Sequence, residues 1–372
     1  MKLAVFDADA DPRDVYAAVK AAFNGSGGPV LLGGSVARAG DLPAGTIAVV
    51  TTSGSTGVPK SVVLSRASLT ASALSTMKRV GEGAWMLALP ATYVAGLQVL
   101  VRSVIGGHEP TFLSGHFTTD AFIRAAADMA RVAPGVPRYT SLVPAQLQTI
   151  VEEAEDPAVV GAARSFTAIL VGGQALPAAL SEHAEALGIR VVRTYGSSET
   201  AGGCVYDQVP LEFVRARTVD GEIQLAGPML ADGYWGYAAL TDATFVRDGD
   251  DLRWCRTGDA GSVEDGLVTV IGRIDNVLIS GGVNVSLDRV ERAVRSVPGA
   301  ERGVIVAADD DRWGQVPVLV VEADRAGLLD EARAAAEAAV GVAGRPARVV
   351  VMVPLPTLTS GKPDRRTITA RL

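Results

Sequence analysis

A short segment of hydroxyl-bearing residues and glycines ends at a lysine near residue 60. It reads Thr51-Thr52-Ser53-Gly54-Ser55-Thr56-Gly57-Val58-Pro59-Lys60. Glycines let backbone amides turn toward an anion, hydroxyls add donors, and lysine brings a mobile positive charge, so this composition predicts a polyphosphate-binding loop. The residues predicted to contact phosphate are Ser53, Gly54, Ser55, Thr56, Gly57 and Lys60. Pro59 stands where a Walker loop needs glycine, and a polar hairpin loop has a similar composition, so the segment alone does not identify a nucleotide site.

Two other positions carry residues that suit a ligand. Gly172-Gly173-Gln174 follows an apolar segment typical of a buried strand, and α/β sheets bind ligands at the carboxyl ends of their strands. A simple turn from strand to helix explains the same three residues. Arg102 lies in an apolar predicted helix, where an arginine either extends to the surface or faces an acidic ligand. The residue types leave both positions open.

Four further motifs follow the glycine-rich loop along the chain. They are Thr194-Tyr195-Gly196-Ser197-Ser198-Glu199-Thr200, Arg256-Thr257-Gly258-Asp259, Gly272-Arg273-Ile274-Asp275 and Thr359-Ser360-Gly361-Lys362. In this order the five segments resemble the phosphate loop, adenylate-binding turn, ribose motif, interdomain hinge and catalytic-lysine motif of the acyl- and aryl-CoA synthetase, luciferase and adenylation-domain superfamily. Five ordered matches over roughly residues 45 to 366 do not arise readily by chance, so the chain is identified as a member of that superfamily.

The resemblance implies roles for individual residues of a nucleotide site. It gives Thr200 a phosphate contact and makes Glu199 a ligand of Mg2+, which bridges phosphate oxygens. It assigns Asp259 to the ribose hydroxyls of ATP and the ring of Tyr195 to adenine. The remaining residues of the implied nucleotide site are Gly172, Gly173, Gln174, Gly196 and Arg273. Without the resemblance, Ser198-Glu199-Thr200 fits a polar helix start, and Asp259 fits a turn.

The same resemblance implies a two-step reaction. A carboxylate resists a thiol until one oxygen belongs to a leaving group, and AMP from ATP supplies that group. Lys362 is expected to bridge the acyl carboxylate and the α-phosphate, although a lysine in such a tail is commonly only solvated. Coenzyme A then accepts the acyl group. Because its thiol and Lys362 need the same approach to the acyl carbon, we expect a small domain to pivot at Asp275.

The segment from Leu89 to Ser103 is similar to the acyl-pocket segment of o-succinylbenzoate:CoA ligases of menaquinone biosynthesis. This implies a diacid substrate of which only the succinyl carboxylate is activated. A cation is then needed for the second carboxylate, and Arg102 is the candidate, with Tyr93 and Gly96 as further substrate residues. The departures from the family are Ser61 where glycine usually follows the lysine, Thr92-Tyr93 where histidine or an aromatic is common, and a shorter amino-terminal region.

The secondary-structure elements that must position these residues show two different sequence patterns along the chain. Short apolar runs alternate with amphipathic segments through the first two thirds, as in Thr46 to Val50 followed by Ser68 to Val80, which predicts a parallel-rich α/β sheet with flanking helices. From Asp220 onward, turn dipeptides separate apolar runs, which predicts hairpins. We therefore expect an α/β fold: a large multi-layered domain at residues 1–274, shortened at its amino end, and a small mobile α+β domain at residues 275–372.

The composition of the chain limits the classes of molecule that it is expected to bind. The formal net charge of -7 has acids and bases interspersed, so no nucleic acid is expected. No apolar run approaches the ~20 residues that span a bilayer, so no membrane insertion is expected. The acidic start does not resemble a secretory signal, and Cys204 and Cys255 make no disulfide framework, so we expect a cytoplasmic protein. The expected ligands are a carboxylic acid, ATP and coenzyme A, and related enzymes imply a homodimer.

Other functions remain open at this point. Within the superfamily, another aryl- or acyl-CoA ligase or a freestanding amino-acid adenylation enzyme fits the same motifs. Outside it, the loop alone fits a phosphotransferase or NTPase, or a nucleotide-binding protein without catalysis. Release of pyrophosphate, rather than of the γ-phosphate, separates adenylation from the last two classes.

Overall fold

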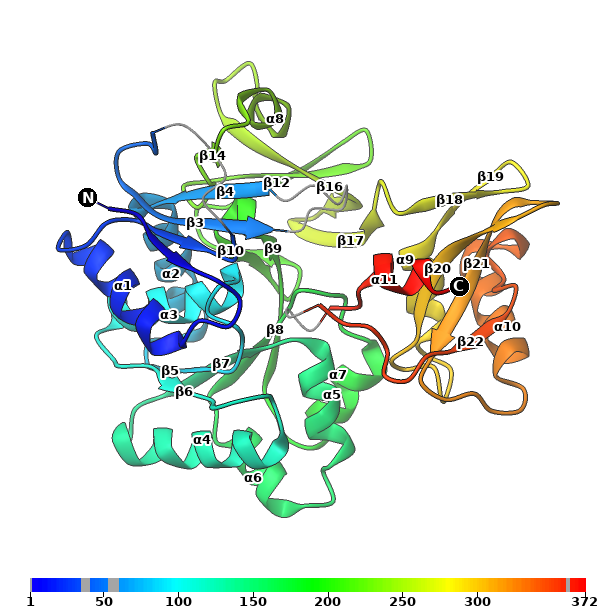
Figure 1. Ribbon diagram of the computed structural model, residues 1–372, viewed down its shortest axis with the longest axis horizontal. Helices are drawn as coiled ribbons and strands as arrows, with labels where there is room; N and C mark the ends of the chain where they lie inside the picture. Colours follow the sequence, from blue (N-terminus) through cyan, green and yellow to red (C-terminus); the bar gives the residue numbers. More distant parts are fainter. Residues whose placement is uncertain (1, 35–40, 53–59, 359–361) are drawn as a thin grey trace.

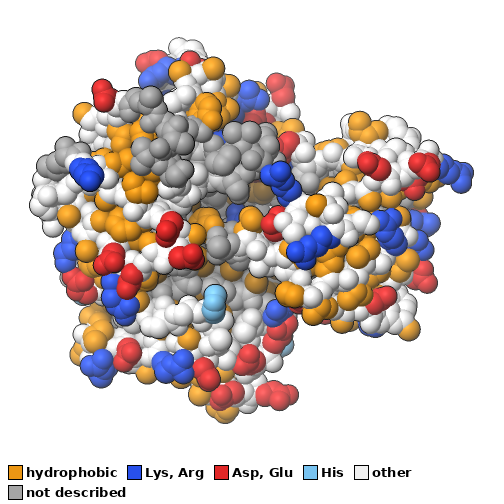
Figure 2. Space-filling model, viewed as in Figure 1, with side chains coloured by type: hydrophobic (Ala, Val, Ile, Leu, Met, Phe, Trp, Pro, Cys, Tyr) orange, Lys and Arg blue, Asp and Glu red, His pale blue; other side chains and the backbone are white. Residues whose placement is uncertain are grey.

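The computed structural model describes residues 2–34, 41–52, 60–358 and 362–372. These residues form a large part made of three sheets and a small part made of one sheet (Figure 1). On the face shown in Figure 2, acidic and basic side chains are interspersed over both parts. Among the described residues, no helix combines the length and apolarity that crossing a bilayer requires.

The first sheet carries both ends of the predicted phosphate loop. Its strands, in spatial order, are β1 (Ala4–Phe6), β2 (Val30–Leu32), β3 (Thr46–Thr52), β4 (Lys60–Ser65) and β14 (Gly233–Tyr234). Strands β3 and β4 are antiparallel, and Thr52 lies opposite Lys60. The segment after the lysine is therefore a strand, as predicted, and not the helix that follows a Walker loop.

The second sheet is the largest and is mostly parallel. Its strands, in order, are β11 (Val209–Pro210), β10 (Gly202–Tyr206), β9 (Val191–Ser197), β8 (Ala168–Val171), β7 (Arg138–Leu142), β5 (Ala84–Leu87) and β6 (Thr111–Phe112). Alternate residues of a strand face opposite sides of a sheet. Ala168 and Leu170 of β8 accordingly belong to one hydrophobic cluster, and Ile169 and Val171 belong to another. Helices cover both faces, which is why the central strands β5 and β8 are apolar and buried along their whole length.

Two groups of helices provide those layers. The cluster between the first and second sheets takes side chains from α1 (Pro12–Asn24), α2 (Arg66–Val80) and α3 (Val94–Gly106). The cluster on the opposite face takes side chains from α4 (Thr119–Val132), α5 (Pro144–Glu152), α6 (Pro157–Arg164) and α7 (Ala178–Ala186). Helix α2 matches the predicted segment Ser68 to Val80 closely, and α3 is the apolar helix predicted around Arg102.

The third sheet begins where the sequence predicts hairpins. It contains β12 (Arg215–Val219), β13 (Glu222–Ala226), β16 (Arg253–Glu264), β15 (Phe245–Arg247) and β17 (Leu267–Arg273), all antiparallel, and α8 (Ala238–Thr244) precedes β15. Asp220 and Gly221 have φ values of 50° and 79° in the turn between β12 and β13. Two consecutive left-handed residues are typical of a tight hairpin turn, so this prediction is confirmed.

The small part is an α+β layer. Its strands are β18 (Val277–Ser280), β19 (Val283–Ser286), β20 (Val304–Asp310), β21 (Gly314–Val321) and β22 (Val349–Val351). Its helices are α9 (Leu287–Val294), α10 (Leu328–Val340) and α11 (Arg365–Ala370). Every hydrophobic cluster of described residues lies wholly on one side of residue 274. We infer from this packing a boundary between residues 274 and 275.

A buried carboxylate ties the chain around Lys362 to the small sheet. Glu291 of α9 accepts hydrogen bonds from the backbone amide of Ile305 at 2.9 Å and from Arg365 Nη2 at 2.7 Å. The backbone oxygen of Lys362 accepts a hydrogen bond from the amide of Leu358 at 2.7 Å. The backbone around Lys362 is therefore packed with the small part of the chain.

Candidate functional site

A pocket of about 280 Å³ lies where strands of all three large sheets converge. It is lined by Lys60, Tyr195, Gly196, Ser197, Glu199, Glu222, Leu225, Tyr234, Ala243, Thr244, Cys255, Arg256, Thr257, Gly258, Asp259 and Arg273. Six of these residues are ones that the sequence predicts for a nucleotide site: Lys60, Tyr195, Gly196, Glu199, Asp259 and Arg273. Side chains separated by more than 200 positions in the chain thus share one cavity.

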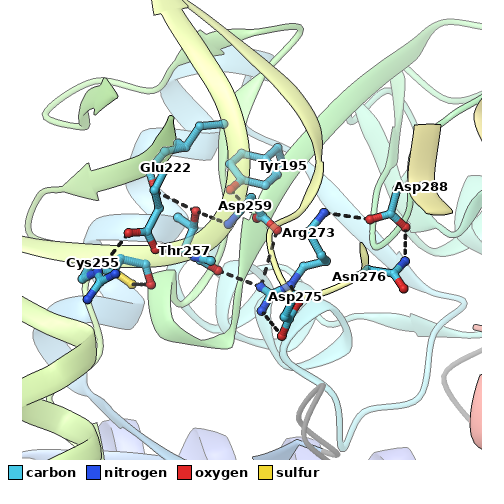
Figure 3. A network of polar contacts seen from close by, with 12 residues as sticks. Tyr195, Glu222, Cys255, Thr257, Asp259, Arg273, Asp275, Asn276 and Asp288 are labelled. Carbon is cyan, nitrogen blue, oxygen red and sulfur yellow. Dashed lines mark hydrogen bonds and ion pairs between the residues drawn. The ribbon is translucent and has the colours of Figure 1, made fainter. Parts of the chain in front are cut away.

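Asp259 lies on β16 between an aromatic hydroxyl and a guanidinium (Figure 3). Tyr195 Oη donates a hydrogen bond to Oδ2 at 2.6 Å, and Arg273 Nη1 lies 3.5 Å from Oδ1. Burial raises the pKa of Asp259, while the hydrogen bond from Tyr195 and the charge of Arg273 lower it. Burial and the nearby Asp259 charge raise the pKa of Tyr195, so its hydroxyl remains a donor. The carboxylate is oriented as an acceptor for further hydroxyls, as a ribose requires.

The turn that carries Asp259 is held by a glutamate that sequence reasoning missed. Glu222 is buried; one of its oxygens accepts the amide of Gly258 and the other accepts Arg256 Nε, both at 2.9 Å. Gly258 has φ of 69°, and a Cβ there would lie 2.8 Å from Arg273 Nη2. Glycine is required at this position for both reasons. Nothing in the sequence pairs Glu222 with this turn, since the contact depends on strand register.

Arg273 joins the turn to the predicted hinge. Its Nη1 donates to the Thr257 carbonyl oxygen at 2.7 Å, and its Nε and Nη2 donate to the two carboxylate oxygens of Asp275 at 2.9 and 3.1 Å. The bonds to Asp275 and the charge of Asp259 raise the pKa of Arg273. The amide of Arg273 donates to Asp288 of α9 at 2.7 Å. The pocket, the hinge and the small part therefore meet at one residue.

Glu199 and Lys60 carry opposite charges on another wall of the pocket. Glu199 belongs to the short 3-10 helix η1 (Ser198–Thr200), and one of its carboxylate oxygens accepts Tyr234 Oη at 2.8 Å. Lys60 Nζ lies 5.5 Å from the centroid of the Tyr234 ring. An ammonium that faces the pocket suits phosphate, and a carboxylate suits magnesium.

The residues present fit a magnesium ion that arrives with phosphate. Among the described residues there is no group of three His, Cys, Asp or Glu side chains that holds a metal by itself. Mg2+ keeps several waters and is commonly bound by one or two carboxylates together with substrate phosphates. Glu199 supplies one such carboxylate, so the donor set matches a phosphate-borne ion and not a dedicated protein cage.

Thr200 lies beside the pocket, and its hydroxyl is bonded to backbone groups of the turn to which Thr200 belongs. The side chain is 1% exposed; Oγ1 donates to the Gly202 carbonyl oxygen at 2.8 Å and accepts the amide of Ser197 at 2.9 Å. These are bonds that shape η1. The phosphate contact expected for Thr200 stays a prediction, and it requires the hydroxyl to rotate.

Lys362 lies at the junction of the two parts. A Cβ built on Gly173, which has φ of 82°, would be 3.5 Å from Lys362 Cε. The side chain is solvent accessible, yet the protein that surrounds it lowers its pKa by reducing hydration, with Asp259 acting in the opposite direction. Gly172 approaches Thr194 closely, since a Cβ there would lie 2.2 Å from Thr194 Oγ1. Gly173 thus lies next to the lysine, and the nucleotide contacts expected for Gly172, Gly173 and Gln174 stay predictions.

Helix α3 carries a buried polar cluster around Arg102. The side chain of Arg102 is only 5% exposed and its guanidinium carbon lies 4.1 Å from the centroid of the Trp85 ring, so it does not extend to the surface. Within the described part of the chain, six buried polar atoms of this region lack a hydrogen-bond partner: Trp85 Nε1, Thr92 Oγ1, Gln98 Oε1, Arg102 Nε, Arg102 Nη1 and Ser103 Oγ. Burial lowers the pKa of Arg102. Buried unpaired donors on a cation favour an anionic ligand.

The Arg102 cluster lies next to the turn formed by residues 194–200. Gln98, one helical turn before Arg102, donates through Nε2 to the Ala201 carbonyl oxygen at 2.7 Å. Ala201 directly follows Thr200. Sequence reasoning missed Gln98, although its spacing of four from Arg102 places both on one helix face.

Gly96 and Tyr93 have different surroundings. A Cβ on Gly96 would lie 2.1 Å from the Pro90 carbonyl oxygen, so glycine is needed there for close packing of α3. Tyr93 is the residue before α3 and is half-buried. Substrate contacts for both stay predictions. Ser53, Gly54, Ser55, Thr56 and Gly57 lie outside the described residues.

Comparison with known proteins places the chain among nucleotide-dependent enzymes. Residues 9–235 match the family model described as AMP-binding enzyme. A probable 2-succinylbenzoate–CoA ligase of Mycobacterium tuberculosis is 38% identical over 337 residues, which cover 87% of this chain and 84% of the relative. O-succinylbenzoate coenzyme A synthetase of Bacillus subtilis in complex with AMP is similar at a TM-score of 0.73 and 25% identity, over 87% of this chain and 69% of that one. The same enzyme solved with ATP and a magnesium ion has a TM-score of 0.74 at 23% identity, over 97% and 83%.

A glycine substitution tests whether the turn geometry matters for nucleotide binding. We expect Gly258→Ala to lower ATP affinity by about tenfold or more, because a displaced Arg273 loses a charged hydrogen bond worth roughly 1.5–3 kcal/mol. The measurement is isothermal titration calorimetry. Gly266→Ala is the matched control, since Gly266 has φ of 78° in the same hairpin and no atom within 4 Å of a Cβ. Equal losses of affinity in both variants would show that backbone strain alone is responsible.

Proposed function

The chain belongs to the AMP-binding enzyme family, and we propose that it is an ATP-dependent 2-succinylbenzoate (o-succinylbenzoate)–CoA ligase. The observation that supports this substrate is the environment of Arg102. Its guanidinium is buried, and Nε and Nη1 have no hydrogen-bond partner within the described residues. It lies on the helix whose Gln98 contacts the turn after Thr200. A second carboxylate on the substrate supplies the missing acceptor.

The first half-reaction is adenylation. One oxygen of the succinyl carboxylate attacks the α-phosphorus of ATP, the bond from that phosphorus to the bridging oxygen of the β-phosphate breaks, and pyrophosphate leaves. Lys60, together with the loop before it, holds the phosphates, and Asp259 accepts the ribose hydroxyls. Lys362 bridges the carboxylate and the α-phosphate, and its positive charge offsets the negative charge of both groups as they approach. Magnesium held by Glu199 neutralises phosphate charge when bound.

The second half-reaction transfers the acyl group. The sulfur of CoA attacks the acyl carbon, loses its proton, and displaces AMP to leave the thioester. The small domain, residues 275–372, must first withdraw Lys362, and Asp275 is the proposed pivot. In the present arrangement the two domains are also joined by an ion pair between Arg302 and Glu152, which is solvent accessible and costs little to break.

The proposal extends to the location and the oligomeric state of the protein. A cytoplasmic location is supported by Cys204 and Cys255, which are buried free thiols. A homodimer is the proposed assembly. Size-exclusion chromatography with light scattering tests it, and a single species of 38.3 kDa would contradict it.

The function itself is tested by product analysis. With ATP, magnesium and CoA, 2-succinylbenzoate is expected to give its CoA thioester, AMP and pyrophosphate in equal amounts, measured by liquid chromatography with mass spectrometry. A panel of other aromatic, aliphatic and amino acids serves as the comparison. If another acid turns over while 2-succinylbenzoate is inert, the substrate is wrong. If γ-phosphate is released in place of pyrophosphate, the reaction class is wrong.

The role of Arg102 predicts a separation of activity from stability. Arg102→Met keeps the volume of the side chain and removes an unpaired buried charge, so the melting temperature is expected to stay level or rise. Its kcat/KM for 2-succinylbenzoate should fall by at least about thirtyfold, since a desolvated charged contact is worth roughly 2–5 kcal/mol. The monoacid 4-oxo-4-phenylbutanoate, which lacks the ring carboxylate, should lose far less. Equal losses on both acids would make Arg102 a structural residue.

Separate assays of the two half-reactions test the moving domain. Lys362→Ala should lose pyrophosphate exchange yet still convert supplied acyl-adenylate and CoA to thioester. Asp275→Pro fixes φ near about -65° and should do the reverse, losing thioester formation by orders of magnitude. Asp275→Ala is the control, because it also loses the bonds to Arg273 but keeps a free backbone. Proportional losses in both half-reactions for Lys362→Ala and Asp275→Pro would rule out alternating orientations.

A further inference from the structure

Tyr234 occupies the space between the two opposite charges of the phosphate end of the pocket. Its side chain is 6% exposed, and it lies on β14, which pairs with β4 so that Tyr234 is opposite Val62. Lys60 is two residues from Val62 and therefore faces the same side of the sheet. The ring lies under the Lys60 ammonium at 5.5 Å, and the hydroxyl donates to Glu199 at 2.8 Å.

The orientation of the ring is fixed from several directions. The amide of Tyr234 donates to Thr241 Oγ1 at 2.9 Å, and the amide of Trp235 donates to the Ser61 carbonyl oxygen at 2.8 Å. The ring also packs against Phe245 at 6.1 Å between centroids. The orientation of the Tyr234 ring is therefore set by its own packing and backbone bonds. The side chains of Lys60 and Glu199 take their positions relative to this fixed ring.

A carboxylate and an ammonium that line one pocket attract each other, and direct pairing would satisfy both before any ligand arrives. In the described part of the chain, no ion pair joins Lys60 to Glu199; Lys60 lies over the ring of Tyr234, and Glu199 accepts a hydrogen bond from its hydroxyl. We propose that Tyr234 is a positioning residue that keeps Glu199 and Lys60 apart and aims them at magnesium and phosphate respectively. This inference rests on the proposed function, which assigns those two ligands.

The phenol suits this task because it is neutral and remains a donor. A phenol is uncharged at neutral pH, and its hydroxyl donates to the carboxylate of Glu199. A hydrogen bond to one oxygen of Glu199 leaves the other free for a metal, and the electron-rich ring face attracts a cation without neutralising it. A charged residue in its place would pair permanently with one of the two groups.

Two substitutions separate the hydroxyl from the ring. Binding of ATP is measured by isothermal titration calorimetry over a series of free Mg2+ concentrations. Tyr234→Phe should raise the Mg2+ concentration for half-maximal ATP affinity by about tenfold, as expected for a lost outer partner of a metal ligand, and leave affinity at saturating Mg2+ unchanged. Tyr234→Leu should in addition lower affinity at saturating Mg2+ by about fivefold, because Lys60 is released from the ring.

Tyr139→Phe is the matched control. Tyr139 is as deeply buried, and its hydroxyl donates to the Val80 carbonyl oxygen at 2.9 Å, away from the pocket. Its Mg2+ dependence should match that of the unaltered protein. The proposal is overturned if Tyr234→Phe also shows unaltered Mg2+ dependence, or if Tyr139→Phe shifts it as much. The titration needs no carboxylic acid, so it remains readable if 2-succinylbenzoate proves not to be the substrate.

Discussion

The guanidinium of Arg273 is the constraint on which the arrangement of the two domains depends. It bonds to the Thr257 carbonyl oxygen, approaches Asp259 and holds both oxygens of Asp275, while its own amide is bound by Asp288 of α9 (Figure 3). The pocket lined by Asp259 and the proposed hinge are thus parts of one polar network. A rotation at residue 275 must break some of these bonds, so ribose binding and domain orientation are expected to influence each other.

The proposed substrate end of the site depends on buried polar groups of Arg102 that have no hydrogen-bond partner among the described residues. Each unsatisfied buried polar group costs about 1–3 kcal/mol, and Arg102 presents two such nitrogens. Stacking on Trp85 offsets part of this cost. On the proposed function, a substrate carboxylate between Arg102 and its polar neighbours removes the remainder, so a diacid binds favourably where a monoacid leaves the cation unpaired. The Gln98 bond to the Ala201 carbonyl oxygen fixes this cluster next to the turn that carries Glu199 and Thr200.

Motif order in the sequence was sufficient to predict the fold class, and the family match confirms the superfamily. The roles of Lys60, Glu199 and Asp259 stay predictions, although the structure brings them into one cavity. The sequence did not indicate Glu222 or Tyr234, because their contacts depend on how distant strands align in register. It also did not show that the Thr200 hydroxyl bonds to nearby backbone groups, because the spacing of residues does not determine a side-chain rotamer.

The most direct test of adenylation follows the oxygen atoms of the substrate. If the succinyl carboxylate attacks the α-phosphorus, 2-succinylbenzoate labelled with ¹⁸O in that carboxylate must transfer one label to AMP when the thioester forms. Mass spectrometry of the nucleotide products is the measurement. The account predicts AMP with one ¹⁸O and unlabelled pyrophosphate. Label in orthophosphate, with ADP as the nucleotide product, would indicate an acyl phosphate and contradict it.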